Sequence, residues 1–183
     1  RFPPRGFVAA LREIADELGA LLIADEVYTG MGRTGRWLAC EHEGVVPDVV
    51  ALGKALGGGL PLSACAGRPE VMQRWPASRG EALHTSTHLG NPLACAAGLT
   101  VLRVLERDSL LARAEKLGAR WLTELRSRLA SSPRVREVRG LGLLLAVELD
   151  DPGAARGAVS RLLQSGWITL GEDLDISETA VDV

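Results

Sequence analysis

The chain has 183 residues, of which 46% are hydrophobic, and its formal net charge is −2. This composition predicts a soluble globular protein with a substantial core, and the nearly equal, interspersed basic and acidic residues give no sign of a nucleic-acid partner. No apolar run approaches the roughly 18 residues of a membrane span, and the opening RFPPRG does not resemble a signal peptide, so we expect no membrane partner.

The first half of the chain reads as one helix followed by strands. Apolar residues at helical spacing predict an amphipathic helix over roughly 4–18, which Gly19 ends. Three short continuous apolar runs, at 21–24, 48–52 and 62–66, are typical of strands that are buried on both faces. Strands of this kind mixed with helices indicate an α/β fold with a mostly parallel sheet.

The second half of the chain begins with a clear helix start. Asn91 is suited to be an N-cap and Pro92 to occupy the first helical position. Further elements are expected after it: a helix over about 109–130, one or two strands within 135–149, and a helix near 153–165.

A domain boundary is expected after the helix that Asn91 opens. We place it near residue 107, so that residues 1–107 belong to one domain and residues 108–183 to another. The strands within 135–149 then belong to a separate layer in the second domain.

The cysteines and lysines narrow the possible chemistry. Cys40, Cys65 and Cys95 have no metal-ligand spacing and suit thiols in a reducing cytoplasm, so we expect a cytoplasmic protein without a metal site. Of 21 basic residues only Lys54 and Lys116 are lysines, which leaves few candidates for chemistry that needs a primary amine.

The segment Gly30–Gly35 satisfies the dinucleotide-binding pattern G-x-G-x-x-G a few residues after an apolar run. A dinucleotide loop needs its glycines at the end of the strand, where backbone N–H groups meet the pyrophosphate. Here Asp25 and Glu26 come first and would repel a diphosphate. A nicotinamide-dependent oxidoreductase is therefore the weaker alternative, and the glycines more simply permit a tight loop.

Asp25 and Lys54 form the stronger candidate pair. Asp25 ends the first predicted strand and Lys54 follows the second, so both side chains reach one crevice if the two strands are parallel neighbours. Apolar neighbours predict a poorly solvated lysine, which suits an amine nucleophile. Taken singly, Lys54 is better explained as a solvated loop lysine and Asp25 as a helix-capping or turn carboxylate. Together they are the two protein groups that pyridoxal phosphate requires.

Two segments carry a resemblance to a known family. They read LLIADEVYTGMGRTGRW at 21–37 and PDVVALGKALGGGLP at 47–61. They closely resemble the signature of the class III pyridoxal-phosphate-dependent aminotransferases, the ornithine, acetylornithine and 4-aminobutyrate type. HTSTHLGNPLACAAGL at 84–99 and VRGLGLLLAVEL at 138–149 are also similar to family segments.

The resemblance extends to about residue 170 and implies a fold. The chain would be part of a fold-type I pyridoxal-phosphate-dependent transferase. Residues 1–107 would form the C-terminal part of the large cofactor-binding domain, and residues 108–183 the start of an incomplete small C-terminal domain.

The resemblance also implies roles for the residues that match the signature. Lys54 would hold the cofactor as a Schiff base and then move a proton between the substrate α-carbon and the cofactor's C4′ carbon. Asp25 would keep the pyridine nitrogen protonated, and Val27 would pack against one face of the ring. Tyr28 stands where the family often has a glutamine that contacts the ring hydroxyl.

A further pair of residues is implied to bind the cofactor phosphate. Ser86 and Thr87 match the family segment that reaches into the neighbouring subunit's site, which implies a homodimer with shared active sites. The reaction implied is transfer of an amino group from an amino acid or amine donor to a 2-oxo acid acceptor.

Several alternatives remain open beside transamination. Asp25 and Lys54 would serve a decarboxylating transaminase or an aminomutase equally well, although the retained G-R-T-G favours transamination. A non-catalytic remnant that only dimerises is a further possibility. Family members are more than twice as long, so we expect the sequence to be a fragment with the Schiff-base half of the site, inactive alone and with exposed apolar interfaces.

Overall fold

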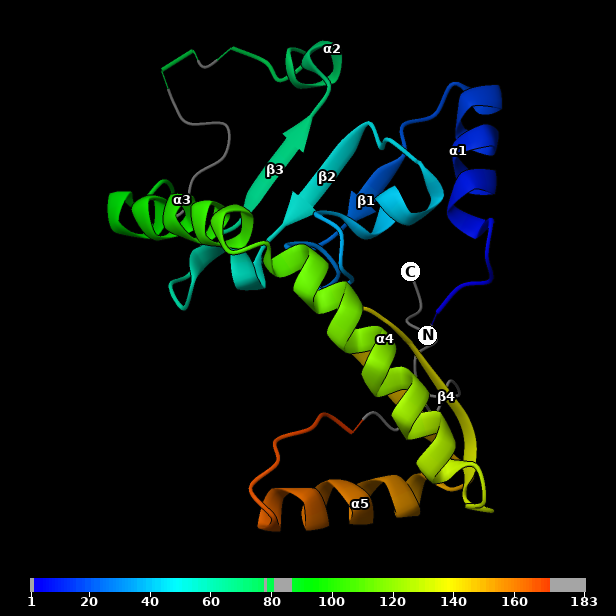
Figure 1. Ribbon diagram of the computed structural model, residues 1–183. Coiled ribbons are helices and arrows are strands. Elements are labelled where there is room, and N and C mark those ends of the chain that lie inside the picture. Colours follow the sequence, from blue (N-terminus) through cyan, green and yellow to red (C-terminus); the bar gives the residue numbers. More distant parts are fainter. Residues whose placement is uncertain (1, 78, 81–86, 172–183) are drawn as a thin grey trace. The chain divides into compact units, whose positions relative to one another are not determined.

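The computed structural model describes residues 2–77, 79–80 and 87–171 (Figure 1). They divide into two compact units. The first contains the chain up to Trp121 together with Gly140–Leu145, and the second contains Leu122–Arg139 and the chain from Ala146 onward. The domain boundary expected near residue 107 stays a prediction.

Helix α1, Phe7–Leu18, is the first element, and its sequence-based prediction is confirmed. The helix ends at Gly19, whose left-handed backbone lets its N–H bond the carbonyls of the last turn. It begins later than expected because Glu43, from a distant segment, caps it. The two carboxylate oxygens of Glu43 accept the N–H groups of Gly6 and Ala9, each at 3.0 Å.

A three-stranded sheet forms the centre of the first unit, in the order β1, β2, β3 (Figure 1). All three predicted strands are present, as β1 Ile23–Asp25, β2 Val49–Leu52 and β3 Ala64–Gly67. β1 and β2 are parallel, whereas β2 and β3 are antiparallel, so the described sheet is mixed rather than mostly parallel. The link from β2 to β3 is too short for the helical crossover that parallel neighbours need, because it holds only the 3₁₀ turn η2, Lys54–Gly57.

The strands are less buried than the sequence predicts. The prediction that the strands are buried on both faces is wrong for β1 and β3. Ile23 is 63% exposed, and Ala64, Cys65 and Ala66 are exposed. The helices of the described residues leave much of the sheet uncovered. The apolar face of α1 is also open, with Leu18 76% exposed, which agrees with the expected exposed apolar interfaces.

Asp48 connects α1 to the sheet. Its buried carboxylate accepts bonds from the Arg12 guanidinium at 2.6 Å and from the Leu22 N–H at 2.8 Å, and the Arg68 guanidinium lies 3.1 Å away. The hydrogen bond from Arg12 is the main reason that the pKa of Asp48 lies below its ordinary value. Because the folded pKa is lowered, this carboxylate stabilises the fold at neutral pH, and its contribution is lost as the pH falls through that pKa.

Helix α3, Pro92–Arg107, confirms the predicted helix start. The Asn91 side-chain oxygen accepts the N–H groups of Leu93 at 2.9 Å and Ala94 at 3.3 Å. The remaining elements are η1 Ala39–Glu43, α2 Pro69–Met72, α4 Leu110–Leu129, β4 Val135–Leu141, β5 Leu144–Leu149 and α5 Pro152–Gln164.

The later elements also agree with the sequence. The segment at 135–149 forms two strands, β4 and β5, paired in a separate sheet, and helices α4 and α5 lie where they are expected. In the second unit, Arg139 donates to Glu148 at 2.5 Å, and Arg126 donates to the Val138 carbonyl at 2.9 Å. Among the described residues, no helix combines the length and hydropathy that a bilayer span requires.

Glycines allow three segments of the first unit to pack in direct backbone contact. A Cβ atom at Gly118 in α4 would lie 1.9 Å from the Gly142 carbonyl oxygen, and a Cβ at Gly142 would lie 2.3 Å from the Thr34 carbonyl carbon. The Leu143 N–H donates to the Arg33 carbonyl at 2.9 Å. The turn that joins β4 to β5 therefore packs against α4 and also holds the loop containing Thr34.

Gly118→Ala tests this close packing. Alanine normally stabilises a helix interior relative to glycine by about 0.5–1 kcal/mol, but here its methyl group would meet backbone that cannot move aside. We expect Gly118→Ala to lower the free energy of unfolding by about 1–3 kcal/mol. Chemical denaturation measures the change.

Gly157→Ala is the matched control, because Gly157 lies in α5 and a Cβ there would meet only the end of the flexible Arg161 side chain, at 3.4 Å. It should stabilise the protein by about 0.5–1 kcal/mol. Equal stabilisation by both substitutions would contradict the packing described.

Candidate functional site

The parallel pairing of β1 with β2 brings the two candidate segments together. Asp25 is the last residue of β1 and pairs with Ala51, and Lys54 follows two residues after the end of β2. The Glu26 N–H donates to the Ala51 carbonyl at 2.9 Å, so the pairing continues past Asp25. Because the strands are parallel, Asp25 and Lys54 leave the sheet at the same edge, as the sequence predicts.

Lys54 has an unusual backbone and a clear side-chain contact. Its φ of 43° lies in the left-handed region, which non-glycine residues seldom adopt and which is found disproportionately at functional sites. Its Nζ lies 4.9 Å from the centre of the Tyr28 ring. The side chain is exposed, so the expectation of a poorly solvated lysine is wrong for the described residues: its apolar neighbour Leu56 turns into the core and does not cover it.

Val27 connects the C-terminal ends of β1 and β2. A Cβ atom at Gly53 would lie 3.2 Å from the Val27 Cγ1, so the half-buried valine side chain occupies the space that glycine leaves. Sequence reasoning missed Gly53, whose only signal is its place directly before Lys54. This contact holds the residues that follow β1 against the residues that follow β2.

Asp25 and Glu26 point to opposite sides, as strand geometry requires. Asp25 is exposed, and its Oδ1 accepts the Val27 N–H at 3.0 Å. Glu26 is 4% exposed; its Oε1 accepts the Cys40 N–H at 3.0 Å and its Oε2 accepts the Thr29 hydroxyl. Glu26 therefore holds the loop in place, and Asp25 alone of the two carboxylates faces the edge of the sheet.

The Glu26 carboxylate also affects a thiol. Burial raises the pKa of Cys40 to about 11, and the neighbouring negative charge and hydrogen bond of Glu26 add to the rise. Cys40 is buried, whereas Cys65 and Cys95 are exposed. The Cys40 thiol is thus a structural group at neutral pH.

The Gly30–Gly35 loop does not have the form of a nucleotide-phosphate loop. Its glycines and Met31 are buried, and four of its N–H groups already donate to carbonyls within the segment 26–37, those of Gly30, Met31, Arg33 and Gly35. The helix expected after a dinucleotide loop is replaced by the five-residue η1. The structure therefore disfavours the oxidoreductase alternative.

The predicted phosphate-binding residues, Ser86 and Thr87, precede helix α3 in the sequence. Ser86 lies outside the described residues. Thr87 is exposed and precedes Asn91, the N-cap of α3. Their contact with a cofactor phosphate stays a prediction.

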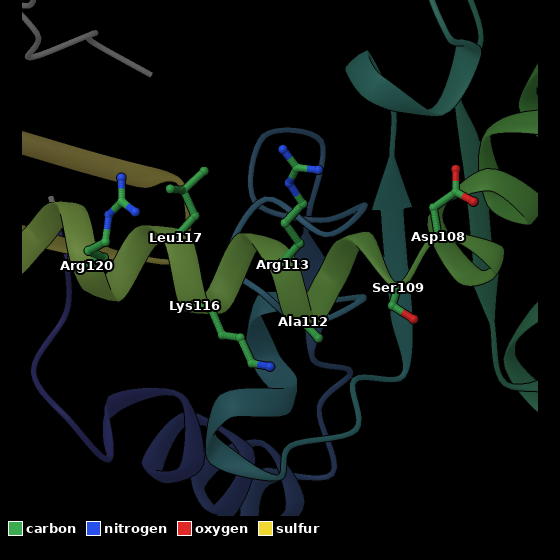
Figure 2. A pocket seen from close by; sticks show the side chains of 7 residues that line it. All are labelled: Asp108, Ser109, Ala112, Arg113, Lys116, Leu117 and Arg120. Atoms are coloured by element: carbon green, nitrogen blue, oxygen red, sulfur yellow. The ribbon is translucent and has the colours of Figure 1, made fainter.

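An open depression of about 520 Å³ lies elsewhere, along α4 and the two residues before it. Figure 2 shows its lining side chains, with Arg113 and Arg120 on one side of the helix and Lys116 on the other. It contains none of the predicted site residues and is a charged helix surface. Among the described residues, no group of three or more His, Cys, Asp and Glu side chains is arranged to hold a metal ion.

Comparison with known proteins identifies a matching family and similar solved structures. The family described as aminotransferase class-III matches residues 1–176. Ornithine aminotransferase of Toxoplasma gondii is 41% identical with a TM-score of 0.84, over 92% of this chain and 40% of that one. The Plasmodium yoelii enzyme is 39% identical with a TM-score of 0.84, over 92% and 44% of the two chains.

An acetylornithine aminotransferase is also similar. The enzyme of Elizabethkingia anophelis is 38% identical with a TM-score of 0.83, over 91% of this chain and 41% of that one. The chain therefore spans less than half the length of these relatives. A second Toxoplasma gondii structure is described as having partial occupancy of pyridoxal phosphate at its active site.

Glu26→Gln tests the buried carboxylate. Removing the negative charge should stabilise the Cys40 thiolate and lower the pKa of Cys40, although burial, the larger cause, should keep it above the ordinary 9.0. The pH dependence of iodoacetamide alkylation, read at Cys40 by peptide mass spectrometry, measures the change. Cys65 and Cys95 are references within the same chain, and an unchanged midpoint at Cys40 would show that Glu26 has no effect on it.

Proposed function

The chain belongs to the class III aminotransferases, and from that premise we propose that the protein transfers an amino group from an amino acid or amine donor to a 2-oxo acid. Pyridoxal phosphate is the cofactor of this family. The observation that carries the proposal is the parallel pairing of β1 and β2, which puts Asp25 and Lys54 at one edge of the sheet.

The residues at this edge suit the cofactor chemically. The aldehyde group of the cofactor needs a primary amine, which Lys54 provides. The pyridine nitrogen of the cofactor needs an acid partner, which Asp25 provides. Val27 supplies an apolar surface between them, held by its contact with Gly53. When bound, the cofactor supplies an electron sink for the substrate α-carbon.

Each residue has a definite task in this proposal. The Asp25 carboxylate, oriented by the Val27 N–H, would lie beside the ring nitrogen and favour its protonated form. Lys54 Nζ would attach to the aldehyde carbon and would later carry a proton between the substrate α-carbon and the C4′ carbon. Tyr28 contacts the Lys54 side chain through its ring.

Ser86 and Thr87 complete the proposed cofactor site. Their hydroxyl groups would donate to the cofactor phosphate, in front of the N-terminus of α3. This segment would serve the site of a neighbouring subunit. We therefore propose a homodimer with shared active sites, working in the cytoplasm.

The donor is proposed only as a class. The similar enzymes are named for ornithine and acetylornithine, both amino acids with more than one nitrogen, so an ω- or α-amino donor fits. A decarboxylating transaminase or an aminomutase would use the same Asp25 and Lys54. The retained G-R-T-G at residues 32–35 supports transamination over these.

Trapping with borohydride tests the proposal. Pyridoxal phosphate followed by borohydride should label Lys54, and Lys54→Ala should abolish both the label and the visible absorbance. Lys116→Ala is the matched control, since Lys116 lies exposed on α4, and it should leave both unchanged. Labelling that persists without Lys54 would refute the assignment.

Asp25→Asn should weaken cofactor affinity by about tenfold or more, because the ring nitrogen loses its charged partner.

The homodimer has its own test. Sedimentation velocity of the cofactor-loaded protein should give twice the mass of one chain. The exposed apolar side chains agree with such an interface. A monomer that still catalyses transamination would contradict the shared site.

A further inference from the structure

Tyr28 is the residue of the strand-end site whose role the family signature leaves open. The family often has a glutamine there, which contacts the cofactor, whereas this chain has an aromatic ring. The ring faces Lys54: the Nζ atom lies 4.9 Å from the ring centroid. This distance is within the roughly 6 Å over which an ammonium is attracted to the face of an aromatic ring.

The backbone around the pair brings the two side chains together. Val27 packs on Gly53, so the residues that follow each of them, Tyr28 and Lys54, leave the two strands side by side. The left-handed backbone of Lys54, with φ 43°, sets the direction in which its side chain starts. Glu26 holds the start of the same loop through Cys40 and Thr29.

We infer that Tyr28 is a positioning residue that acts on Lys54 through its ring face rather than on the cofactor through its hydroxyl. The inference rests on the proposed function of Lys54. The ring holds the ammonium at the sheet edge, where the four-carbon side chain of an exposed lysine would otherwise sample many rotamers. A glutamine at this position has no π face and cannot make this contact.

The contact exists only while the nitrogen is charged, and this gives the inference a chemical consequence. To attack an aldehyde, the Lys54 ammonium must first release a proton to solvent. The neutral amine then bonds to the aldehyde carbon, and the carbonyl oxygen leaves as water together with the two remaining nitrogen protons. The contact with the ring must be given up before this attack, so Tyr28 restrains the reactivity of Lys54 toward any electrophile.

Competitive labelling of the two lysines tests the inference without cofactor. The protein is treated at one fixed pH with a trace of the succinimidyl ester of acetic acid, and acetylation of Lys54 is measured relative to Lys116 by mass spectrometry. Lys116 lies on α4 and is an internal reference for reagent concentration and pH. Tyr28 is 47% exposed, so its substitution leaves the core intact.

Three variants separate the ring from the hydroxyl. Tyr28→Phe keeps the ring and should leave the labelling ratio unchanged. Tyr28→Leu and Tyr28→Gln remove the π face and should raise the ratio about two- to fivefold, the size expected for a cation–π contact at an exposed site. A ratio that is unchanged or lower in the Leu and Gln variants, or one that rises equally in Tyr28→Phe, overturns the inference.

Cofactor trapping on the same variants keeps the two claims apart. Borohydride-fixed pyridoxal phosphate on Lys54 reports on the proposed function, whereas the acetylation ratio reports on Tyr28 alone. If trapping fails in every form of the protein, the proposed function fails and the ratio still decides the role of the ring. If Tyr28→Phe lost trapped cofactor while its acetylation ratio stayed unchanged, the hydroxyl would act on the cofactor directly and the inference would be wrong.

Discussion

Three residue pairs in the parallel ladder of β1 and β2 determine where the chemistry of this protein can occur. Ile23 pairs with Val49 and Asp25 with Ala51, in parallel, and the pairing continues through the Glu26 N–H. An antiparallel pairing would have placed Asp25 and Lys54 at opposite edges of the sheet. Everything proposed for the acid and the amine depends on this direction.

Two kinds of contact with surrounding residues hold the C-terminal ends of β1 and β2 in place. Polar contacts of the buried Glu26 carboxylate hold the loop that follows Asp25, and close packing of Val27 on Gly53 holds the residue before Lys54. Farther along the same loop, Thr34 lies against the backbone of Gly142, so the loop is fixed at both ends. Pre-organised groups of this kind are what a cofactor site requires, because bound geometry must be held without further ordering.

Local features of the fold could be predicted because they depend on neighbouring residues alone. Gly19 ends α1, Asn91 caps α3, and each apolar run forms a strand. Features that depend on distant segments could not. The capping of α1 by Glu43, the antiparallel direction of β3 and the exposure of Lys54 follow from packing that no local pattern encodes. The same limit applies to the site: spacing indicated the acid and the amine, but not the ring that lies over the amine.

A crystal structure of the protein with pyridoxal phosphate is the most direct test of the account. We predict that the aldehyde carbon is bonded to Lys54 Nζ while the ring nitrogen lies at hydrogen-bond distance, about 2.7–3.2 Å, from the Asp25 carboxylate. A cofactor held away from Lys54, or one whose ring nitrogen meets a group other than Asp25, would contradict the idea that these two strand ends share one ring.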